Sequence, residues 1–338
     1  MKVLLYTENE QLLSKSGLGK AIKHQMKALD LVGVEYTTDK HDDYDIVHLN
    51  TYGIKSYNLA KSARKKGKKV VYHAHSTEED FKNSFILSNQ VSPLFKKWIT
   101  KCYELGDFII TPTPYSKKLL ESYGIKNPIQ ALSNGIEIDF FKREDVKHNK
   151  FRKTYGYKKS DTIIMGIGLF IERKGILDFV ELARRMPEYE FIWFGYTAKA
   201  LIPEKVKKAI NTKLPNLKFP GYVESSVIKE ALMDTDLYIF PTHEETEGIP
   251  ILEACAMKCD ALIRDIPVFE EWLVDGKNVH KAKDVDEFEQ KIKQIISKEL
   301  PKLSDEAYKV AQERDLKNIG IELKKIYENV LVKEYEKV

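Results

Sequence analysis

Short apolar runs alternate with amphipathic helical patterns along most of the chain, and this alternation constrains the possible folds more than any other feature. The strand-like runs fall into two sets. The first set is Lys2–Tyr6, Val34–Thr38, Tyr44–Leu49, Lys69–His73, Phe108–Thr111 and Ile129–Leu132. The second set is Thr162–Gly168, Glu190–Phe194, Leu217–Phe219, Leu237–Phe240 and Ala261–Arg264. Strands that alternate with helices predict parallel sheets connected by right-handed crossovers.

A polar and charged stretch, residues 140–159, separates the two sets, and the length of 338 residues suggests about two domains. We therefore expect an α/β protein with two Rossmann-like domains, residues 1–150 and 151–317, facing each other across a cleft. A final helical pattern occupies residues 318–338 and could pack back on the first domain.

Charge is distributed unevenly between the two halves. Residues 1–150 carry 24 Lys and Arg against 18 Asp and Glu, a net charge of +6, whereas the remainder carries 31 against 33, a net charge of −2. A basic half suggests phosphate, nucleic acid or an anionic membrane as a partner. Three cysteines and no signal-peptide pattern predict reduced thiols and a cytoplasmic location.

One strand–loop–helix segment combines groups that suit a sugar nucleotide. The apolar run 237–241 is followed by a loop, 242–249, and by a helical pattern with Pro250 in its first turn. Gly248 allows close approach of a ligand, and the amides near Ile249 suit a phosphate. Glu245 and Glu253 would then accept hydrogen bonds from sugar hydroxyls. The alternative interpretation is a solvated acidic loop that caps a helix.

The spacing Glu245-x7-Glu253, with Gly248 inside it, resembles the signature of retaining glycosyltransferases of the GT-B fold, family GT4. In that fold the last helix usually packs back on the N-terminal domain. The resemblance implies that the loop containing Gly17 and Gly19 approaches the phosphates of the donor, although a flexible turn is the alternative.

Three further matches lie in the second half of the sequence. The family has an Arg followed by Lys-Gly after the first strand of this half; Lys174 matches, but Leu169 occupies the Arg position. Arg173 could supply the missing charge. Val223 corresponds to the strand end that holds the nucleotide base.

His75 follows a strand in the first half and matches the family's His that binds the transferred sugar and helps to orient the reacting groups. Asn50, Thr51 and Tyr52 follow the preceding strand and are candidate acceptor-side residues. Two Asp-x-Asp sequences, at 43–45 and 234–236, precede strands, and we interpret them as turn and capping residues. We expect no metal and no cofactor, because the sugar nucleotide is a substrate.

Two features suggest shallow membrane binding. The basic cluster consists of Arg64, Lys65, Lys66, Lys68 and Lys69. The helical pattern around residues 81–105 combines apolar and basic side chains, namely Phe95, Lys96, Lys97, Trp98 and Lys101. Such a pattern is typical of an interfacial helix, but also of a core helix with one solvated side.

The stretches 75–80, 112–117 and 266–272 look most like those of Gram-positive bacterial glycolipid synthases. That resemblance implies transfer of a hexose from UDP-glucose or UDP-galactose to diacylglycerol or a glycolipid acceptor, such as monoglucosyl-diacylglycerol, at the inner face of the cell membrane. The alternatives are a GT4 transferase with a soluble glycan or protein acceptor and a non-catalytic sugar-nucleotide-binding protein. Nucleic acid is not an expected partner, because the basic residues form no known nucleic-acid-binding motif.

Overall fold

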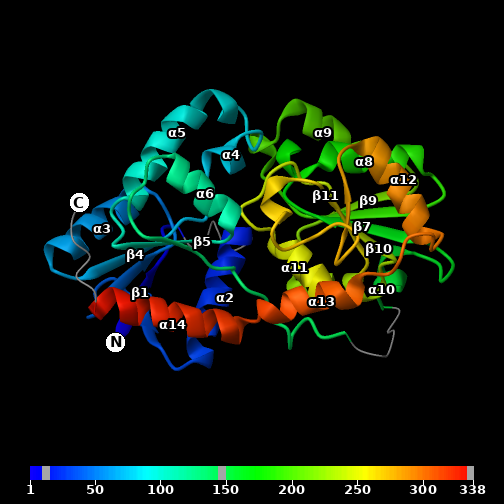
Figure 1. Ribbon diagram of the computed structural model, residues 1–338. Helices are drawn as coiled ribbons and strands as arrows, with labels where there is room; N and C mark the ends of the chain where they lie inside the picture. Colours follow the sequence, from blue (N-terminus) through cyan, green and yellow to red (C-terminus); the bar gives the residue numbers. More distant parts are fainter. Residues whose placement is uncertain (10–15, 144–149, 333–338) are drawn as a thin grey trace. The chain divides into compact units, whose positions relative to one another are not determined.

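The computed structural model (Figure 1) describes residues 1–9, 16–143 and 150–332. The chain forms two compact units. The first unit is Met1–Phe81, Gln90–Glu137 and Arg314–Val338, and the second is Lys82–Asn89 and Ile138–Glu313. These divisions differ from the expected boundaries at 150 and 317, and the short segment 82–89 belongs to the second unit. Residues 144–149 of the expected linker and 333–338 of the expected last helix lie outside the described residues.

The first unit contains a six-stranded sheet in the order β2-β1-β3-β4-β5-β6, and every pair of neighbours is parallel. The strands are β1 (Lys2–Tyr6), β2 (Glu35–Thr37), β3 (Ile46–Leu49), β4 (Lys69–His73), β5 (Phe108–Thr111) and β6 (Ile129–Ala131). The helices are α2 (Gly17–Leu31), α3 (Ile54–Lys65), α4 (Glu78–Phe81), α5 (Ser88–Tyr103), α6 (Pro114–Ser122) and α14 (Leu316–Val332).

The second unit contains another parallel six-stranded sheet, in the order β12-β11-β10-β7-β8-β9. Its strands are β7 (Ile163–Ile167), β8 (Glu190–Phe194), β9 (Leu217–Gly221), β10 (Leu237–Phe240), β11 (Ala261–Arg264) and β12 (His280–Ala282). The helices are α7 (Lys150–Tyr155), η1 (Glu172–Lys174), α8 (Ile176–Arg185), η2 (Lys199–Leu201), α9 (Glu204–Ile210), α10 (Ser225–Asp234), α11 (Ile249–Ala256), η3 (Pro267–Phe269), α12 (Val285–Ile296) and α13 (Ser304–Glu313). The prediction of parallel α/β sheets is thus confirmed.

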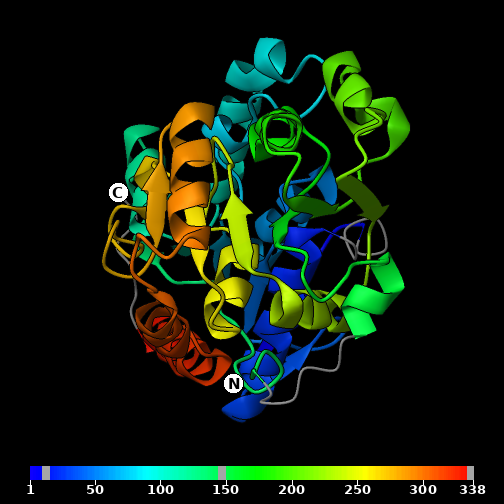
Figure 2. The ribbon, with the colours of Figure 1, turned by 90° about the vertical axis from the view of Figure 1, so that its right-hand side faces the viewer.

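Successive residues of each strand pack on opposite faces of its sheet, and helices cover both faces (Figure 2). In β1, Val3 and Leu5 join the cluster formed with α2 and α14, whereas Leu4 joins the cluster formed with α3, α5 and α6. Burial on both faces explains why the strands read as continuous apolar runs. β12 was missed, because its sequence His-Lys-Ala lacks such a run, and it is held by parallel pairing with β11.

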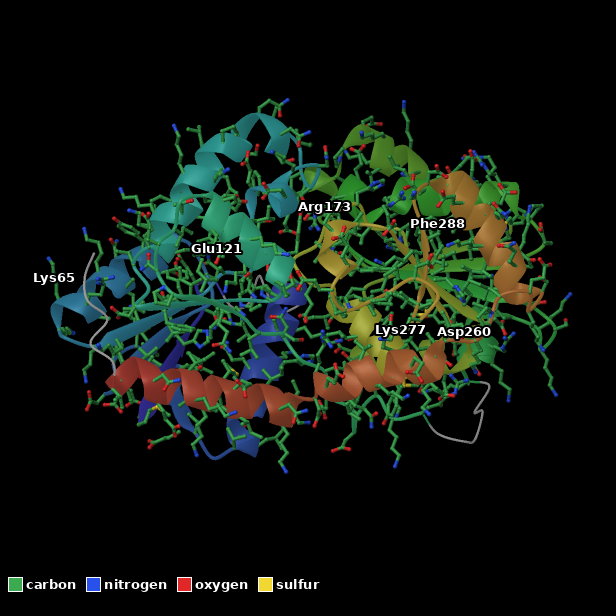
Figure 3. The ribbon with its side chains drawn as sticks, in the orientation of Figure 1. Lys65, Glu121, Arg173, Asp260, Lys277 and Phe288 are labelled. Carbon is green, nitrogen blue, oxygen red and sulfur yellow. The ribbon has the colours of Figure 1, made fainter. Side chains whose placement is uncertain are left out.

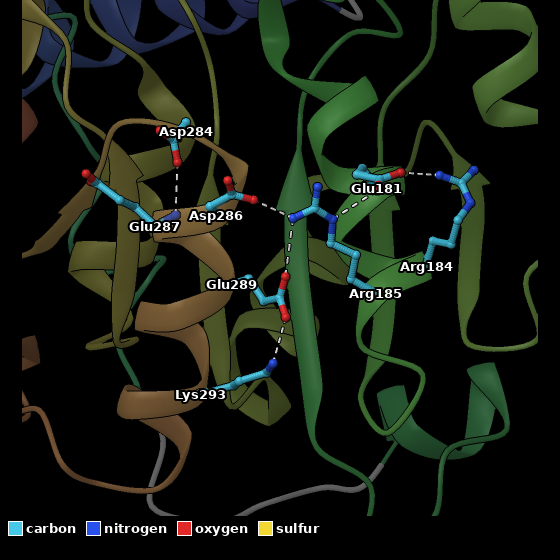
Figure 4. Close-up of polar contacts among 8 residues, drawn as sticks. All are labelled: Glu181, Arg184, Arg185, Asp284, Asp286, Glu287, Glu289 and Lys293. Carbon is cyan, nitrogen blue, oxygen red and sulfur yellow. Dashed lines mark hydrogen bonds and ion pairs between the residues drawn. The ribbon is translucent and has the colours of Figure 1, made fainter.

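Charged side chains link α8 to α12 on the surface of the second unit (Figure 4). Arg185 of α8 contacts Glu181 on its own helix and Asp286 on α12, at 2.9 and 2.6 Å. Asp284 caps α12 by accepting a hydrogen bond from the amide of Glu287 at 3.0 Å. Exposed ion pairs of this kind contribute little stability each, so the contact depends mainly on the apolar residues beneath, including Phe179 and Phe288.

The close packing of α14 on α2 depends on a glycine. A Cβ atom added at Gly320 would lie 2.2 Å from the carbonyl oxygen of Ala28, so the two helices could not keep their present separation. We predict that Gly320→Ala lowers the free energy of unfolding by about 1–3 kcal/mol, despite the better helix propensity of alanine. Urea denaturation would test this. Gly17→Ala is the matched control, because a Cβ at Gly17 meets nothing within 4 Å. Equal stabilities of the two variants would contradict the prediction.

Candidate functional site

The loops that follow β7 and β10 are adjacent in the second unit, because these two central strands are neighbours in the sheet. From β7 the chain continues to β8, toward one edge of the sheet, and from β10 it continues to β11, toward the other edge. Open α/β sheets bind ligands at the carboxyl ends of two such strands. Gly175 lies between η1 and α8 with φ 77°, and a Cβ there would be 2.1 Å from the carbonyl oxygen of Pro241. Only glycine therefore fits between the two loops.

Lys174 and Glu245, which the sequence predicted as separate ligands for phosphate and sugar, form an ion pair across these loops. Their side chains are only 15% and 6% exposed. The hydroxyl of Thr242 also donates a hydrogen bond to Oε1 of Glu245 at 3.0 Å. The pair holds an ammonium group at the carboxyl edge of the sheet, where a bound phosphate would share it with the carboxylate.

Arg173, labelled in Figure 3, binds protein groups of the second unit. Its Nε donates to Oγ of Ser84 at 3.1 Å, and its Nη1 donates to the carbonyl oxygen of Glu244 at 2.7 Å. Its backbone amide donates to Asn83 and its carbonyl accepts from His243, at 3.1 and 2.7 Å. Arg173 thus connects the segment 82–89 to the loop after β10. Its Nη1 also lies 3.8 Å from Oε2 of Glu245, so a second cation is placed beside Lys174.

The start of α11 has the geometry expected for an anion-binding turn. Gly248 has φ 97°, and a Cβ there would be 2.9 Å from the ring of Phe240. Pro250 occupies the first turn and has no N–H, and the amide of Ile251 donates to the carbonyl oxygen of Gly248 at 3.1 Å, so the amide of Ile249 is the one that suits an anion. Glu253, one turn further along α11, is 2% exposed. Val223 follows β9 in the connection to α10 and is half-buried.

In the first unit, Gly17 and Gly19 form the first turn of α2, with Ser16 as its N-cap residue. Oγ of Ser16 accepts a hydrogen bond from the amide of Gly19 at 3.2 Å. This turn follows β1. The strand order of this sheet reverses between β1 and its neighbour β3. The two Asp-x-Asp sequences lie at the opposite ends of strands: Oδ2 of Asp45 accepts from the amide of Lys2, and Oδ2 of Asp236 from that of Ile163, each at 2.8 Å.

His75 lies just beyond β4, and its Nε2 is 2.9 Å from Oδ1 of Asn50. Desolvation lowers the pKa of His75 to about 3, so the ring is neutral at physiological pH. Asn50 is 2% exposed and also contacts Gln25, which the sequence analysis missed. The available signal was the position of Gln25, at helical spacing from Ala21, Ile22, Ala28 and Leu29 on the buried face of α2, which also contains His24.

The other two acceptor-side candidates have protein partners as well. Oγ1 of Thr51 is 2.7 Å from Oγ of Ser56 and accepts from the amide of Glu8 at 2.9 Å. The ring of Tyr52 packs edge-to-face on Phe95, with 5.2 Å between centroids. Asn50 and Thr51 are therefore supporting residues beneath the surface, and the prediction that they bind the acceptor directly is not supported by their positions.

The structure differs in part from the predicted set of membrane-facing residues. Phe95 stacks on Phe81 at 4.1 Å, and Nε1 of Trp98 donates to the carbonyl oxygen of Tyr52 at 2.7 Å, so both aromatic side chains face the core of the first unit. The apolar side chains that α5 exposes are instead Val91 and Leu94, at 41% and 69%.

The basic residues remain at the surface. Lys97 and Lys101 of α5 are exposed, as are Lys65 (Figure 3) and Lys66, whereas Lys96, Lys68 and Lys69 are half-buried. Arg64 is also half-buried and donates to the carbonyl oxygen of Leu105 at 2.9 Å. Among the described helices, none is both long and apolar enough to cross a bilayer.

Comparison with known proteins identifies the family. Residues 147–314 match the model of glycosyl transferases group 1, and residues 30–140 match that of glycosyltransferase family 4. The processive diacylglycerol alpha-glucosyltransferase of Acholeplasma laidlawii is 42% identical over 332 residues, which cover 98% of this chain and 99% of the relative. The alpha-galactosylglucosyldiacylglycerol synthase of Streptococcus pneumoniae is 24% identical over 67% of this chain and 62% of the relative.

A solved structure shares the whole fold. The Anabaena protein HepE, crystallised with UDP-glucose, superposes with a TM-score of 0.74 at 17% identity, covering 97% of this chain and 100% of that chain. Two parallel sheets of the GT-B type, both family models and a relative that is similar over nearly its entire length agree. The chain therefore belongs to the GT4 family of retaining glycosyltransferases.

Proposed function

We propose that this protein transfers glucose from UDP-glucose to diacylglycerol, and then to the glucosyl-diacylglycerol that it has made. The observation that carries the proposal is the 42% identity to a processive diacylglycerol alpha-glucosyltransferase, which extends over almost the full length of both chains. This similarity favours glucose over galactose, whose transfer rests on a relative that is only 24% identical.

The chemistry requires that charge on a departing diphosphate be stabilised. In the proposed reaction, the bond between the anomeric carbon and the phosphate oxygen breaks, and the acceptor hydroxyl forms the new bond on the same face of the sugar. The proton of that hydroxyl passes to the departing phosphate oxygen, which gives UDP and an α-glucoside. Lys174 and the amides at Gly248 and Ile249 stabilise the diphosphate electrostatically.

Other polar residues would hold the rest of the donor. In the second unit, Glu253 would bind the ribose and Glu245 the sugar. In the first unit, the family motif assigns His75 to the sugar and the turn at Gly17 and Gly19 to the donor phosphates. Metal ions take no part in this scheme, since the positive charge comes from Lys174 and from backbone amides. These assignments follow from the family motif, together with the paired position of Lys174 and Glu245.

The first unit would bind the cytoplasmic face of an anionic membrane. Val91 and Leu94 project from α5 beside the exposed Lys97. Lysine side chains near anionic lipid each contribute about 1 kcal/mol of attraction, and the apolar side chains can insert shallowly. Lys96, Lys97 and Lys101 also line an open groove of about 530 Å³, together with Glu78 and Glu104.

The proposal is tested with radiolabelled UDP-glucose and UDP-galactose in parallel. Each donor is supplied with anionic liposomes that contain diacylglycerol, with or without glucosyl-diacylglycerol. We expect label from UDP-glucose in lipids with one and two sugars, at the same rate with and without EDTA. Label from UDP-galactose alone would show that the donor is wrong.

Two other results would overturn the proposal more completely. Transfer to a soluble glycan, with none to lipid, would show that the acceptor is not a lipid. Binding of UDP without turnover in every condition would show that the protein is not an active transferase, and Leu169 would then be the first position to revert to Arg.

A further inference from the structure

A continuous hydrogen-bonded chain of polar side chains crosses the interior of the first unit and ends at His75. Its members, taken in order, are Tyr327 of α14, His48 of β3, Gln25 of α2 with His73 of β4, Asn50 after β3, and His75 after β4. Apart from the partly exposed His75, every member is at most 5% exposed. Six polar side chains are rarely buried together in a core unless their hydrogen bonds fix one particular arrangement of those side chains.

The contacts form a branched network, in which Nε2 of His48 also lies 3.3 Å from Nδ1 of His73. The hydroxyl of Tyr327 lies 2.6 Å from Nδ1 of His48. Nε2 of Gln25 lies 3.2 Å from Nε2 of His48 and 3.1 Å from Nδ1 of His73. Nδ2 of Asn50 donates to Oε1 of Gln25 at 2.9 Å, and Oδ1 of Asn50 lies 2.9 Å from Nε2 of His75. His75 is also stacked on His73, with 3.9 Å between ring centroids, which fixes the plane of its ring.

The direction of these bonds determines where His75 carries its proton. Nε2 of Gln25 faces ring nitrogens of both His48 and His73, and its oxygen is on the other side, where it accepts from Nδ2 of Asn50. Nδ2 of Asn50 is therefore the donor to Gln25, and Oδ1 of Asn50 faces His75. Since a carbonyl oxygen only accepts, Nε2 of His75 must donate, and the neutral ring keeps a lone pair at Nδ1.

The ring is neutral, because desolvation lowers the pKa of His75 to about 3 and that of His48 to about 3, and holds the pKa of His73 well below its ordinary value. The ring nitrogen of His75 that contacts Asn50 is Nε2, and the side chain is partly exposed, so Nδ1 is the nitrogen available to a ligand. A sugar hydroxyl can donate or accept, and the tautomer of His75 decides which of the two it does.

We propose that Gln25 and Asn50 are positioning residues that hold His75 in the Nε2–H tautomer, so that its Nδ1 accepts a hydrogen bond from a hydroxyl of the transferred sugar. The inference rests on the proposed function, in which His75 contacts the sugar. It adds which partner donates the hydrogen bond in that contact, and which side chains determine this. A sugar that lacks the donating hydroxyl would be a poor substrate for the wild-type protein.

The tautomer can be measured without any activity. Full-length protein labelled with ¹⁵N in its histidine rings is examined by NMR at pH 6–8, and His75→Gln assigns the signals of His75. We expect a neutral ring with the proton on Nε2. A proton on Nδ1, or a protonated ring, would overturn the proposal. Failure of the transfer assay would leave this result unaffected, so the two proposals can fail separately.

The positioning role is tested by Asn50→Leu, which removes the acceptor for Nε2–H at similar volume. We expect kcat/KM for UDP-glucose to fall about tenfold or more, while the affinity for UDP alone stays within about twofold, because UDP has no sugar to contact His75. The NMR signals of His75 should shift toward a mixture of tautomers.

Asn127→Leu is the matched control. Asn127 is also an amide of the first unit, but its Nδ2 donates to the backbone carbonyls of Glu104 and Gly106, at 3.2 and 2.6 Å. Asn127→Leu should leave the tautomer of His75, kcat/KM for UDP-glucose and the affinity for UDP unchanged. Parallel losses of UDP and UDP-glucose binding in Asn50→Leu would indicate a purely structural role. If that variant does not fold, Gln25→Leu provides the same comparison.

Discussion

Lys174→Ala is expected to reduce kcat for glucose transfer by about 10²-fold to 10³-fold, which is the usual effect of removing one electrostatic group that stabilises a developing anion. Leu169 occupies the place of the second cation that the family uses, and Arg173 already donates to Ser84 and to the carbonyl of Glu244. The loss of kcat should therefore exceed the loss that the same substitution causes in a family member where a second cation still stabilises the diphosphate. Steady-state kinetics with UDP-glucose and liposomes would measure it.

Removal of Lys174 has a second consequence, because it leaves the nearly buried carboxylate of Glu245 without its nearest cation. Nη1 of Arg173 lies 3.8 Å from Glu245 and Thr242 donates to it, but the remaining negative charge would repel a diphosphate. The double variant Lys174→Ala with Glu245→Gln should recover UDP affinity, although not kcat.

Lys205→Ala is the control for general loss of positive charge in this region. Lys205 is 56% exposed and pairs with Glu172 of η1, the turn that contains Lys174. We expect its activity to stay within about twofold of the wild type, because exposed ion pairs contribute little. A loss of less than tenfold in Lys174→Ala would contradict the assignment of Lys174 as the principal cation.

The sequence was most informative where residues near one another in the chain also act together. The run 237–257 predicted a strand, a loop and a helix, and the structure has β10, the loop and α11 there. The motif also predicted Lys174 and Glu245 as site residues, and the structure adds that they contact each other. That contact depends on the order of strands in the sheet, which local patterns do not encode.

Features that depend on distant residues could not be predicted. The assignment of Phe95 and Trp98 to a membrane face failed, because periodicity along a helix does not say which side faces the core. Their partners, Phe81 and Tyr52, lie in other segments. Gln25 joins the interior hydrogen-bonded chain through His48 and His73, residues on two strands, and nothing adjacent to it in sequence marks that role.

Val91→Asp with Leu94→Asp is expected to weaken binding to anionic liposomes by about a hundredfold. Each change removes an apolar side chain that could insert, and adds a negative charge worth about 1 kcal/mol of repulsion at the membrane surface. Both side chains are exposed, at 41% and 69%, so the free energy of unfolding should change little. Liposome sedimentation would measure binding, and calorimetry would show that UDP affinity is retained.

Ile321→Asp with Leu331→Asp is the matched control, because these side chains of α14 are also apolar and are 39% and 38% exposed. If hydrophobic exposure alone attracted the protein to lipid, both double variants would lose binding. If α5 is the membrane-binding helix, only the first pair should do so, and transfer to lipid should fall with it. Unchanged liposome binding in the α5 variant would mean that α5 is a helix with one solvated side, the alternative that its sequence pattern also allows.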